Sequence, residues 1–583
     1  MPLFALLFCL LALAGFHAPA SAEPGSEKQR LEQYISTMLD GLWRLDPDAA
    51  LAAGYYRYAD RLSVPDAATR DATRAFLRQQ LAALAGFDEK ALAPAQRLDL
   101  IVMRRRFEAD LWELDTFRSW QWQPSSYNVA PGFALQLDTG YAPLDTRLRH
   151  IAARLAAVPA YYAAAQANIA EPTLEHTVLA IEQNQGGLAV FGEDLVQQLA
   201  RSGLADDEKQ LFRTRLTAAR AAIQGYLHFL GELQARLEAR GARSFRIGPA
   251  LYAQKFGHDI QSGYTAEQLH AKAKAEKAKL HDGMEALART LWPKYRGNAP
   301  VPADRLELIG QVIAELGRNH VKPEAFVDTI RRQIPELARF VSEHDLVDQD
   351  ASRPLVVREM PEYMRGTAGA NLQAPGPYDA GANTYYNVTP LTGYASERAE
   401  SFLREYNHWM LQLLSIHEAI PGHYTQLLHA NKSNSLVKVL FGNGAMIEGW
   451  AVYGEKMMLD AGYGGGAPEM WLIWMKWNLR AVCNTLLDYE VHTGTMNEAQ
   501  ALALLTTEAF QSQAEAVDKW RRVRLTQVQL TSYFAGYAEI TAWRDESKAR
   551  LGKAFKLKDF NNRLLSYGSV PVRDIRQLMS EAP

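Results

Sequence analysis

Over most of this chain, apolar residues return every three or four positions, which is the spacing of one face of an α-helix. A chain with this pattern buries its apolar faces by packing helices against one another. The longest such stretch starts with the acids Asp206 and Asp207 and is followed by Gly241, as expected for a helix start and a helix end. The clearest segments are residues 28–45, 69–84, 96–114, 144–169, 206–240 and 266–291. The pattern predicts a mainly α fold.

Length and composition indicate one large body rather than a string of small domains. The 583 residues are 48% hydrophobic, which is enough for a substantial core. A weak change in composition at residues 297–300 predicts two lobes around a cleft, an N-terminal helical lobe over residues 23–297 and a metal-site lobe over residues 298–583. A second irregular stretch, residues 368–393, contains a segment rich in Thr, Tyr and Val at residues 381–389. These residue types favour extended structure and predict a small β region.

Charge and the N-terminal segment limit where the protein acts. A formal net charge of −3 and the lack of a basic run give no indication of nucleic-acid binding. Residues 3–16 are almost continuously apolar and are followed by Ala20-Ser21-Ala22, which predicts a signal peptide over residues 1–22, cleaved after Ala22. No later segment is apolar enough for a membrane span, and Cys483 is the single cysteine after that cleavage. We expect a periplasmic or secreted protein without an intramolecular disulfide.

The richest chemistry lies in the segment HEAIPGH at residues 417–423, followed 25 residues later by Glu448. A catalytic zinc site needs three protein ligands, an open position for water and a separate carboxylate as general base. His417, His423 and Glu448 are the candidate ligands, and Glu418 is the candidate base. The familiar helical pattern places two histidines four residues apart, whereas these two are six residues apart.

The wider spacing requires a departure from regular helix. Side chains six residues apart on a straight helix point about 120° away from each other. Pro421 cannot donate a backbone hydrogen bond to the carbonyl of His417, and Gly422 tolerates unusual dihedral angles. We expect a local bulge at residues 420–422 that returns His423 to the side of His417. The alternative is that Pro-Gly ends the helix and leaves the histidines on a loop.

Two motifs carry a resemblance to a known family. The pattern HExxPGHxxQ over residues 417–426 and the pattern EGWAxYxE over residues 448–455 resemble the bacterial family called domain of unknown function 885. The resemblance runs from about residue 31 to residue 578. Members of that family resemble gluzincin metallopeptidases, whose third zinc ligand is a glutamate on a second helix. The resemblance implies a zincin-like helical body that binds one zinc ion per chain.

The residues around the ligands have expected roles. A zinc ion held by two histidines and one glutamate activates water as a nucleophile, and Glu418 is placed to take the proton and deliver it to the leaving nitrogen. Glu455 lies seven residues after Glu448, near the same helix face. It is expected either to orient a ligand histidine or to be an exposed helical charge. Gln426 and His429 are expected to be surface or packing residues.

Amide hydrolysis also needs a group that stabilises the developing oxyanion. One candidate is His492, preceded by one helical turn by Asp488, which is able to fix its tautomer. The other is Tyr533, with Tyr537 one turn further on, where it would contact substrate. The family resemblance supports both stretches, although Gln527 stands where the family usually has proline. A buried structural role is the alternative for His492 and for Tyr533.

Substrate contacts are expected at two further places. Gluzincins commonly pair the substrate backbone against an edge strand, so Tyr385 and Tyr386 are expected on such a strand bordering the cleft, with an ordinary packing strand as the alternative. A peptide's C-terminal carboxylate needs a basic partner, and Arg544 is the candidate substrate-binding residue. The neighbouring alternatives are Arg521, Arg522 and Arg524, and a structural ion pair is the other possible role of each.

Together these features predict an exported zinc-dependent peptidase that acts on short peptides. Carboxypeptidase-like cleavage is slightly favoured, because helical gluzincins with deep clefts tend to exclude folded proteins. One alternative is a zinc amidohydrolase acting on an isopeptide or another non-standard amide. A second alternative is a non-catalytic binding protein that keeps the metal for structure. The presence of Glu418 argues against the last, since a structural zinc has no use for a free base beside an open position.

Overall fold

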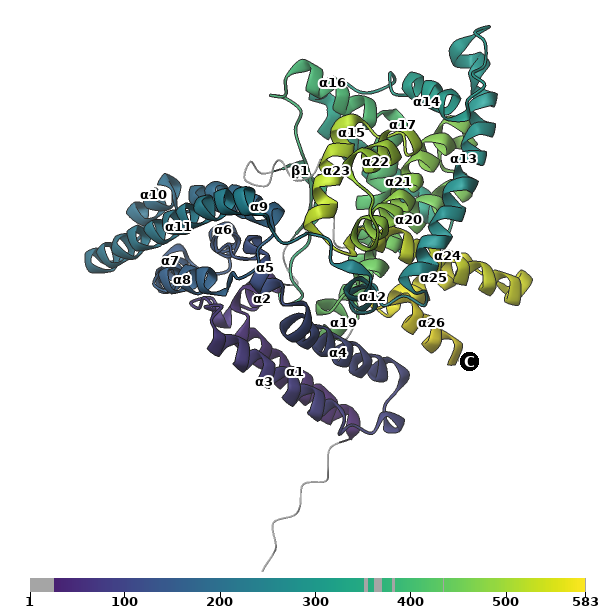
Figure 1. Ribbon diagram of the computed structural model, residues 1–583. Coiled ribbons are helices and arrows are strands. Elements are labelled where there is room, and N and C mark those ends of the chain that lie inside the picture. Colours follow the sequence, from purple (N-terminus) through teal and green to yellow (C-terminus); the bar gives the residue numbers. More distant parts are fainter. Residues whose placement is uncertain (1–25, 351–354, 361–369, 380–382, 434, 582–583) are drawn as a thin grey trace, which may run out of the picture.

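The computed structural model describes residues 26–350, 355–360, 370–379, 383–433 and 435–581 (Figure 1). The predicted signal peptide, residues 1–22, lies outside the described residues. Helices dominate the described part, so the predicted mainly α fold is confirmed (Figure 1). In the same part of the chain, no helix is both long enough and apolar enough to cross a membrane.

The N-terminal helices match the periodic segments of the sequence closely. The predicted helix over residues 206–240 is present with the same bounds, whereas residues 144–169 form two helices instead of one. The interruption precedes Pro159, which has no N–H to continue the first helix and lies in the first turn of the second. The helices of this half are α1 (Glu27–Leu45), α2 (Pro47–Ala52), α3 (Ala67–Leu84), α4 (Pro94–Trp112), α5 (Ser119–Trp122), α6 (Ala130–Asp138), α7 (Leu144–Leu155), α8 (Val158–Asn168), α9 (Leu174–Gly187), α10 (Glu193–Arg201), α11 (Asp206–Arg240), α12 (Gly248–Asp259) and α13 (Ala266–Arg296).

The C-terminal half contains the strands and the helices of the HEAIPGH segment. The three strands lie between α15 and α16, and the segment itself joins α17 to α18. The helices of this half are α14 (Arg305–Leu316), α15 (Phe326–Glu343), α16 (Ser396–Glu405), α17 (His408–Glu418), α18 (His423–Asn431), α19 (Leu436–Leu440), α20 (Gly444–Asp460), α21 (Pro468–Thr493), α22 (Glu498–Ala503), α23 (Gln513–Leu525), α24 (Ser532–Leu551), α25 (Leu557–Ser566) and α26 (Val572–Glu581).

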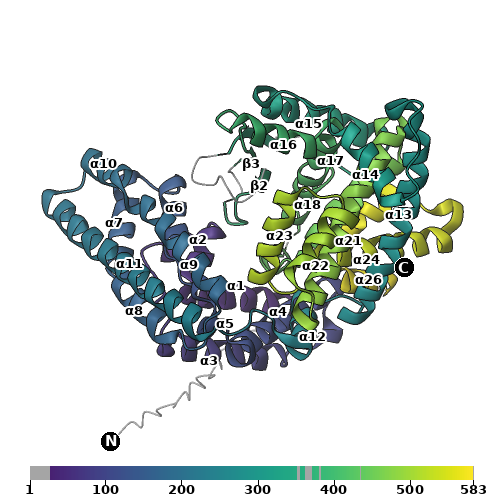
Figure 2. The same ribbon diagram turned by 45° about the horizontal axis from the view of Figure 1, so that its top comes forward.

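Buried apolar residues form two separate cores. The smaller core runs from Tyr127 to Leu233 and is built by α6 to α11. The larger core combines residues from Leu31 to Trp122 with residues from Ile247 to Leu578. Figure 2 shows α7, α8, α10 and α11 on one side of the molecule and α13, α21 and α24 on the other. The division of the core therefore does not follow the expected boundary near residue 297, because α1, α3, α4, α12 and α13 share the core of the metal-site lobe.

The strands form one three-stranded sheet with the order β1-β3-β2, in which β3 pairs parallel to β1 and antiparallel to β2. The predicted small β region is thus confirmed. The expectation that the Tyr385-Tyr386 strand lies at an edge is wrong, because it is the central strand and both of its sides are already hydrogen-bonded. The strands are β1 (Leu355–Glu359), β2 (Ala370–Gln373) and β3 (Thr384–Val388).

Helices α20 and α24 pack against each other more closely than ordinary side chains permit. Gly449 on α20 faces Gly536 on α24, and a Cβ atom built on either residue would lie inside 3.0 Å of the backbone of the other helix. The carbonyl of Ala445 would meet the added carbon at Gly536 first. Small residues are therefore required at this crossing, which brings the helix that carries Glu448 against the helix that carries Tyr533.

We predict that Gly536→Ala lowers the free energy of unfolding by about 3 kcal/mol or more, because the added methyl group has to push α20 and α24 apart. The measurement is chemical denaturation followed by circular dichroism. The matched control is Gly225→Ala in α11, where no atom lies within 4 Å of the added carbon. That variant should be stabilised by up to about 1 kcal/mol through helix propensity alone. Equal stability of the two variants would contradict the close crossing.

Candidate metal centre

The HEAIPGH segment breaks one helix and starts another. Helix α17 ends at Glu418, Ala419 leaves helical geometry with φ −115° and ψ −88°, and α18 begins at His423. The peptide bond between Ile420 and Pro421 is cis. The expected bulge inside a single helix is therefore a complete break. The two histidines nevertheless stay helical, one in the last turn of α17 and the other in the first turn of α18, rather than on a loop.

The break is held by contacts that tolerate no larger residue at Gly422. Its N–H donates to the carbonyl of Ile416 over 3.0 Å. A Cβ atom at this position would collide with the carbonyls of both Ile416 and His417. From α20, the indole Nε1 of Trp450 donates to the carbonyl of Pro421 over 2.8 Å. The turn between the histidines is thus tied to α17 by its backbone and to α20 by one side chain.

The break brings the three predicted metal ligands together. Nε2 of His417 lies 3.7 Å from Oε2 of Glu448, and Nε2 of His423 lies 3.6 Å from the same oxygen. All three donor atoms lie within 4.8 Å of one another. In a tetrahedral zinc site with bonds of about 2.0–2.1 Å, neighbouring donor atoms are about 3.4 Å apart. The two distances to Glu448 are near this value, and two imidazoles with one carboxylate are donors that zinc takes.

A second carboxylate orients the first ligand. Oε1 of Glu455 accepts a hydrogen bond from Nδ1 of His417 over 2.7 Å and a second from Nε1 of Trp477 over 3.0 Å. With the proton on Nδ1, the lone pair of Nε2 points toward Glu448, as metal binding requires. Glu455 is fully buried, so the alternative of an exposed helical charge is wrong. The sequence analysis did not identify Trp477, because its local sequence pattern is the same as that of a tryptophan in the core.

The electrostatics of the site favour a bound cation. Burial lowers the pKa of His417, but the carboxylates of Glu448 and Glu455 outweigh it and raise that pKa well above the ordinary value. Burial also favours the neutral acid of Glu448, yet its interactions with His417 and His423 hold its pKa well below the ordinary range. The carboxylates thus draw positive charge onto the imidazoles, and a divalent cation satisfies the same attraction.

Glu418 is a free carboxyl group next to the ligands. It is the last residue of α17 and follows His417 directly, and it is not among the three convergent donors. Burial raises the pKa of Glu418, the imidazoles of His423 and His417 oppose that rise, and the carboxylate of Glu448 adds to it. A carboxyl group whose pKa is moved toward neutrality is suited to proton transfer.

Tyr533 lies where the sequence predicted, beside the ligands. It is in the first turn of α24, and its pKa is raised by burial and by the charge of Glu448. The positive charge of Arg522 opposes this rise. Arg522 also donates from Nη2 to Oε1 of Gln529 over 2.7 Å. The Tyr533 phenol therefore interacts both with the carboxylate of Glu448 and with the guanidinium group of Arg522.

The structure corrects the expected role of His492. Its Nε2 donates to the main-chain carbonyls of Val523 and Thr526, both over 2.9 Å, and the ring is buried. Asp488 does not fix this ring by a hydrogen bond. Its carboxylate accepts main-chain N–H groups instead, one of them from Val528 over 2.9 Å. Both side chains hold the segment before α24 in place, which is the structural alternative.

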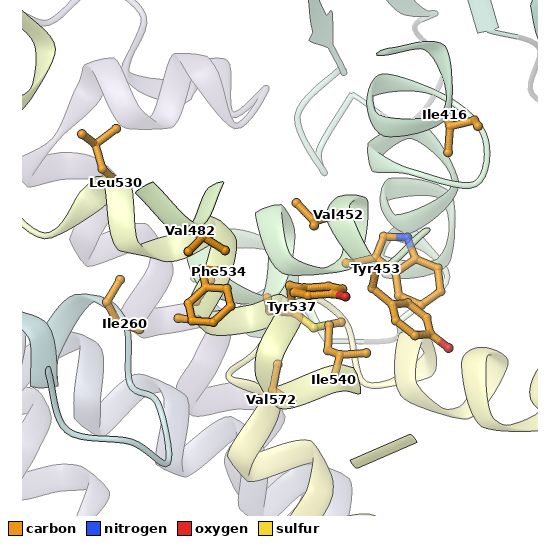
Figure 3. Close-up of a cluster of buried hydrophobic side chains, with 14 of the residues drawn as sticks. Ile260, Ile416, Val452, Tyr453, Val482, Leu530, Phe534, Tyr537, Ile540 and Val572 are labelled. Carbon is orange, nitrogen blue, oxygen red and sulfur yellow. The ribbon is translucent and has the colours of Figure 1, made fainter. Parts of the chain in front are cut away.

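The expected substrate contacts of Tyr537 and Arg544 are also corrected. Figure 3 shows Tyr537 among the buried side chains of the larger core, and the residue is 6% exposed. Arg544 donates from Nε and Nη2 to Asp545 over 2.9 and 2.7 Å and lies 3.6 Å from Asp460. Its guanidinium also lies 5.6 Å from the ring centre of Tyr453. Two carboxylates and an aromatic ring therefore already occupy this arginine.

Two of the three alternative arginines are engaged as well. Arg521 forms an ion pair with Glu182, and Arg524 lies 3.6 Å from Glu175. Both acids belong to α9, so these pairs join α23 to the helices of the smaller core. Arg522, in contrast, has neutral hydrogen-bond partners and faces Tyr533. It is the arginine of this group that the structure brings to the metal centre.

The tyrosines of β3 have separate environments. Tyr386 is fully buried, and burial together with the nearby carboxylate of Glu418 raises its pKa well above the ordinary value. The sheet therefore lies next to the helix of the candidate base, as predicted. Tyr385 is half-buried, and the guanidinium carbon of Arg358 lies 3.8 Å from the centre of its ring. The packing role fits Tyr386, and the central position of β3 leaves no free strand edge at either residue.

Comparison with known proteins places the chain in a family. The family model described as bacterial protein of unknown function, DUF885, matches residues 47–579, so the chain belongs to this family as the motifs predicted. A solved structure of a candidate lipoprotein of unknown function from Shewanella oneidensis shares 52% identity with a TM-score of 0.88, covering 94% of this chain and 99% of that one. A candidate lipoprotein from Colwellia psychrerythraea shares the fold, with 17% identity and a TM-score of 0.79 over 95% of this chain and 99% of that one. No curated protein sequence is significantly similar to this chain.

We predict that Glu455→Gln weakens zinc binding by about 10- to 100-fold, because a neutral amide holds the His417 imidazole less firmly than a carboxylate does. Competition with a chromogenic chelator measures the affinity. The matched control is Glu539→Gln, a half-buried carboxyl group whose oxygen bonds Ser262 and Gly263 instead of a candidate ligand. An unchanged affinity in Glu455→Gln, or an equal loss in both variants, would remove Glu455 from the metal centre.

Proposed function

We propose that this protein is a zinc-dependent peptidase. The observation that carries the proposal is the convergence of two imidazole nitrogens and one carboxylate oxygen within 4.8 Å, with the half-buried carboxyl group of Glu418 beside them. A site that served structure alone would have a fourth protein ligand and no need of a neighbouring base. Glu418 is therefore the feature that favours catalysis over a structural metal.

The side chains of the centre have distinct tasks in this proposal. His417, His423 and Glu448 hold the zinc ion, which when bound supplies Lewis acidity and an activated water. Glu418 accepts the proton of the attacking water and returns it to the leaving nitrogen. The phenol of Tyr533 donates a hydrogen bond to the oxygen of the scissile amide as charge develops on it. Glu455 keeps the His417 ring in the orientation that ligation requires.

Export is proposed as well. The structure from Shewanella oneidensis, which is 52% identical, is described as a candidate lipoprotein. Residues 3–16 of this chain have the apolar character of a signal peptide, and Ala20-Ser21-Ala22 supplies a cleavage site. A periplasmic or secreted enzyme of this kind would meet short peptides and fragments of larger proteins. Peptides are accordingly the substrate class that we favour.

We predict that Glu418→Gln retains one zinc ion per chain but loses at least about 10²–10⁴-fold of its turnover, because the amide cannot accept a proton. Glu448→Ala should lose the zinc ion itself, since two ligands remain. Elemental analysis after identical dialysis and assays on a library of short peptides and isopeptides measure the two properties. The control is Glu498→Gln, an exposed carboxylate at the start of α22, which should behave as the unmodified protein.

Each outcome separates the possibilities. Bound zinc with peptide cleavage that Glu418→Gln abolishes supports the peptidase. Cleavage confined to isopeptides would make the protein an amidohydrolase that acts on non-standard amides. Bound zinc without cleavage of any substrate would indicate a metal-containing binding protein. A well-folded protein that takes up no zinc would contradict the proposal altogether.

A further inference from the structure

Basic side chains from α21 and α23 gather beside the candidate metal centre. Nζ of Lys476 bonds both oxygens of Glu405 at 2.7 Å, and Nη1 of Arg480 bonds Oε1 of Glu515 at 2.8 Å. These two carboxylates are therefore already paired. Lys519 lies one helical turn after Glu515 on α23 and makes no ion pair within 4.0 Å to any carboxylate of the described residues.

Lys519 and Arg522 are the basic groups of this cluster that have no carboxylate partner within the described residues. The side chain of Lys519 is 6% exposed, and burial together with the neighbouring Arg480 and Arg522 holds its pKa well below the ordinary value. Arg522 likewise has no carboxylate partner within the described ranges, and its partners Gln529 and Tyr533 are neutral. Buried basic groups are normally paired, because removal of a charge from water is unfavourable. Two basic side chains without carboxylate partners beside a candidate metal centre indicate that a ligand supplies the counter-ion.

This pair of cations is connected to the metal centre. Lys519 and Arg522 are three residues apart on α23 and so lie on the same face of the helix. The Tyr533 phenol of α24 interacts electrostatically with Arg522 and with the charge of Glu448, which relates that face to the metal centre. Arg480 lies on the other side of the cluster, with its guanidinium 5.0 Å from the ring centre of Trp477, which bonds Glu455. Both ends of the cluster therefore reach residues that contact the ligands.

We propose that Lys519 and Arg522 form a subsite that binds a carboxylate of the substrate, next to the metal centre and on the far side of Tyr533. The guanidinium fork of Arg522 matches a carboxylate in shape, and the ammonium of Lys519 adds a point charge. The carboxylate comes either from the C-terminus of a peptide or from an acidic side chain. This inference rests on the proposed peptidase function for the identity of its ligand.

Binding to an inactive protein tests the subsite without turnover. The zinc-loaded full chain carrying Glu418→Gln is titrated calorimetrically with tetra-alanine, with tetra-alanine amide and with Ala-Ala-Glu-Ala amide. We expect a peptide that has a carboxylate to bind at least fivefold more tightly than tetra-alanine amide. Preference for tetra-alanine identifies the C-terminus as the ligand, and preference for Ala-Ala-Glu-Ala amide identifies an acidic side chain. A smaller preference, or no binding of any of the three peptides, overturns the proposal.

Substitutions in the Glu418→Gln protein test whether Arg522 and Lys519 cause the preference for a peptide carboxylate. Arg522→Met and Lys519→Met should each reduce it to less than twofold, whereas the control Arg521→Met should retain it, because Arg521 pairs with Glu182. We also expect Lys519→Met to raise the melting temperature, since it removes a buried amine that has no ion-pair partner among the described residues. A purely structural lysine would lower it. A preference retained in a folded Lys519→Met protein overturns the proposal, whatever its melting temperature.

Failure of the subsite and failure of the peptidase have different signatures. Carboxylate preference in the binding experiment without hydrolysis by the unmodified protein keeps the subsite and contradicts the peptidase. Hydrolysis by the unmodified protein with equal affinity for the acid and the amide keeps the peptidase and contradicts the subsite.

Discussion

Three consecutive residues of α20 connect the parts of the metal centre. The carboxylate of Glu448 approaches both histidines, Gly449 allows α24 to lie against the helix, and Trp450 donates to the carbonyl of Pro421 in the break between α17 and α18. Successive side chains of a helix point about 100° apart, so three neighbours contact three different partners. The close approach of Gly449 to Gly536 then determines how near the α24 phenol stands to the ligands.

Acidic side chains surround the candidate metal centre, and basic side chains lie on the side of Tyr533. The carboxylates of Glu448 and Glu455 surround the imidazoles and attract a cation. In the proposed subsite, Lys519 and Arg522 would bind a carboxylate of the substrate. The proposed metal ion and this carboxylate would then occupy neighbouring positions near the Tyr533 phenol. The buried environment strengthens both attractions, because water screens them less than it screens charges at the surface.

The sequence prediction succeeded where local pattern decides the outcome and failed where a distant partner decides it. The helix over residues 206–240 follows from its own periodicity, and the grouping of His417, His423 and Glu448 follows from the residue types and their motifs. His492 has the chemistry of a catalytic group, but carbonyls more than thirty residues away accept the hydrogen bonds from its Nε2. Arg544 is likewise occupied by Asp460 on another helix, and the central place of Tyr386 depends on strands β1 and β2.

By itself, the sequence determined the helical character of the protein, its family, its candidate ligands and its candidate base, because periodicity and donor chemistry belong to residues and their neighbours along the chain. The tertiary structure alone decided that the HEAIPGH segment breaks the helix instead of bending it, that β3 is central, and that Arg522 rather than Arg544 interacts with Tyr533 beside the centre. These outcomes depend on which buried groups meet across the core. That pairing is set by the packing of helices from distant parts of the chain, and local sequence does not record it.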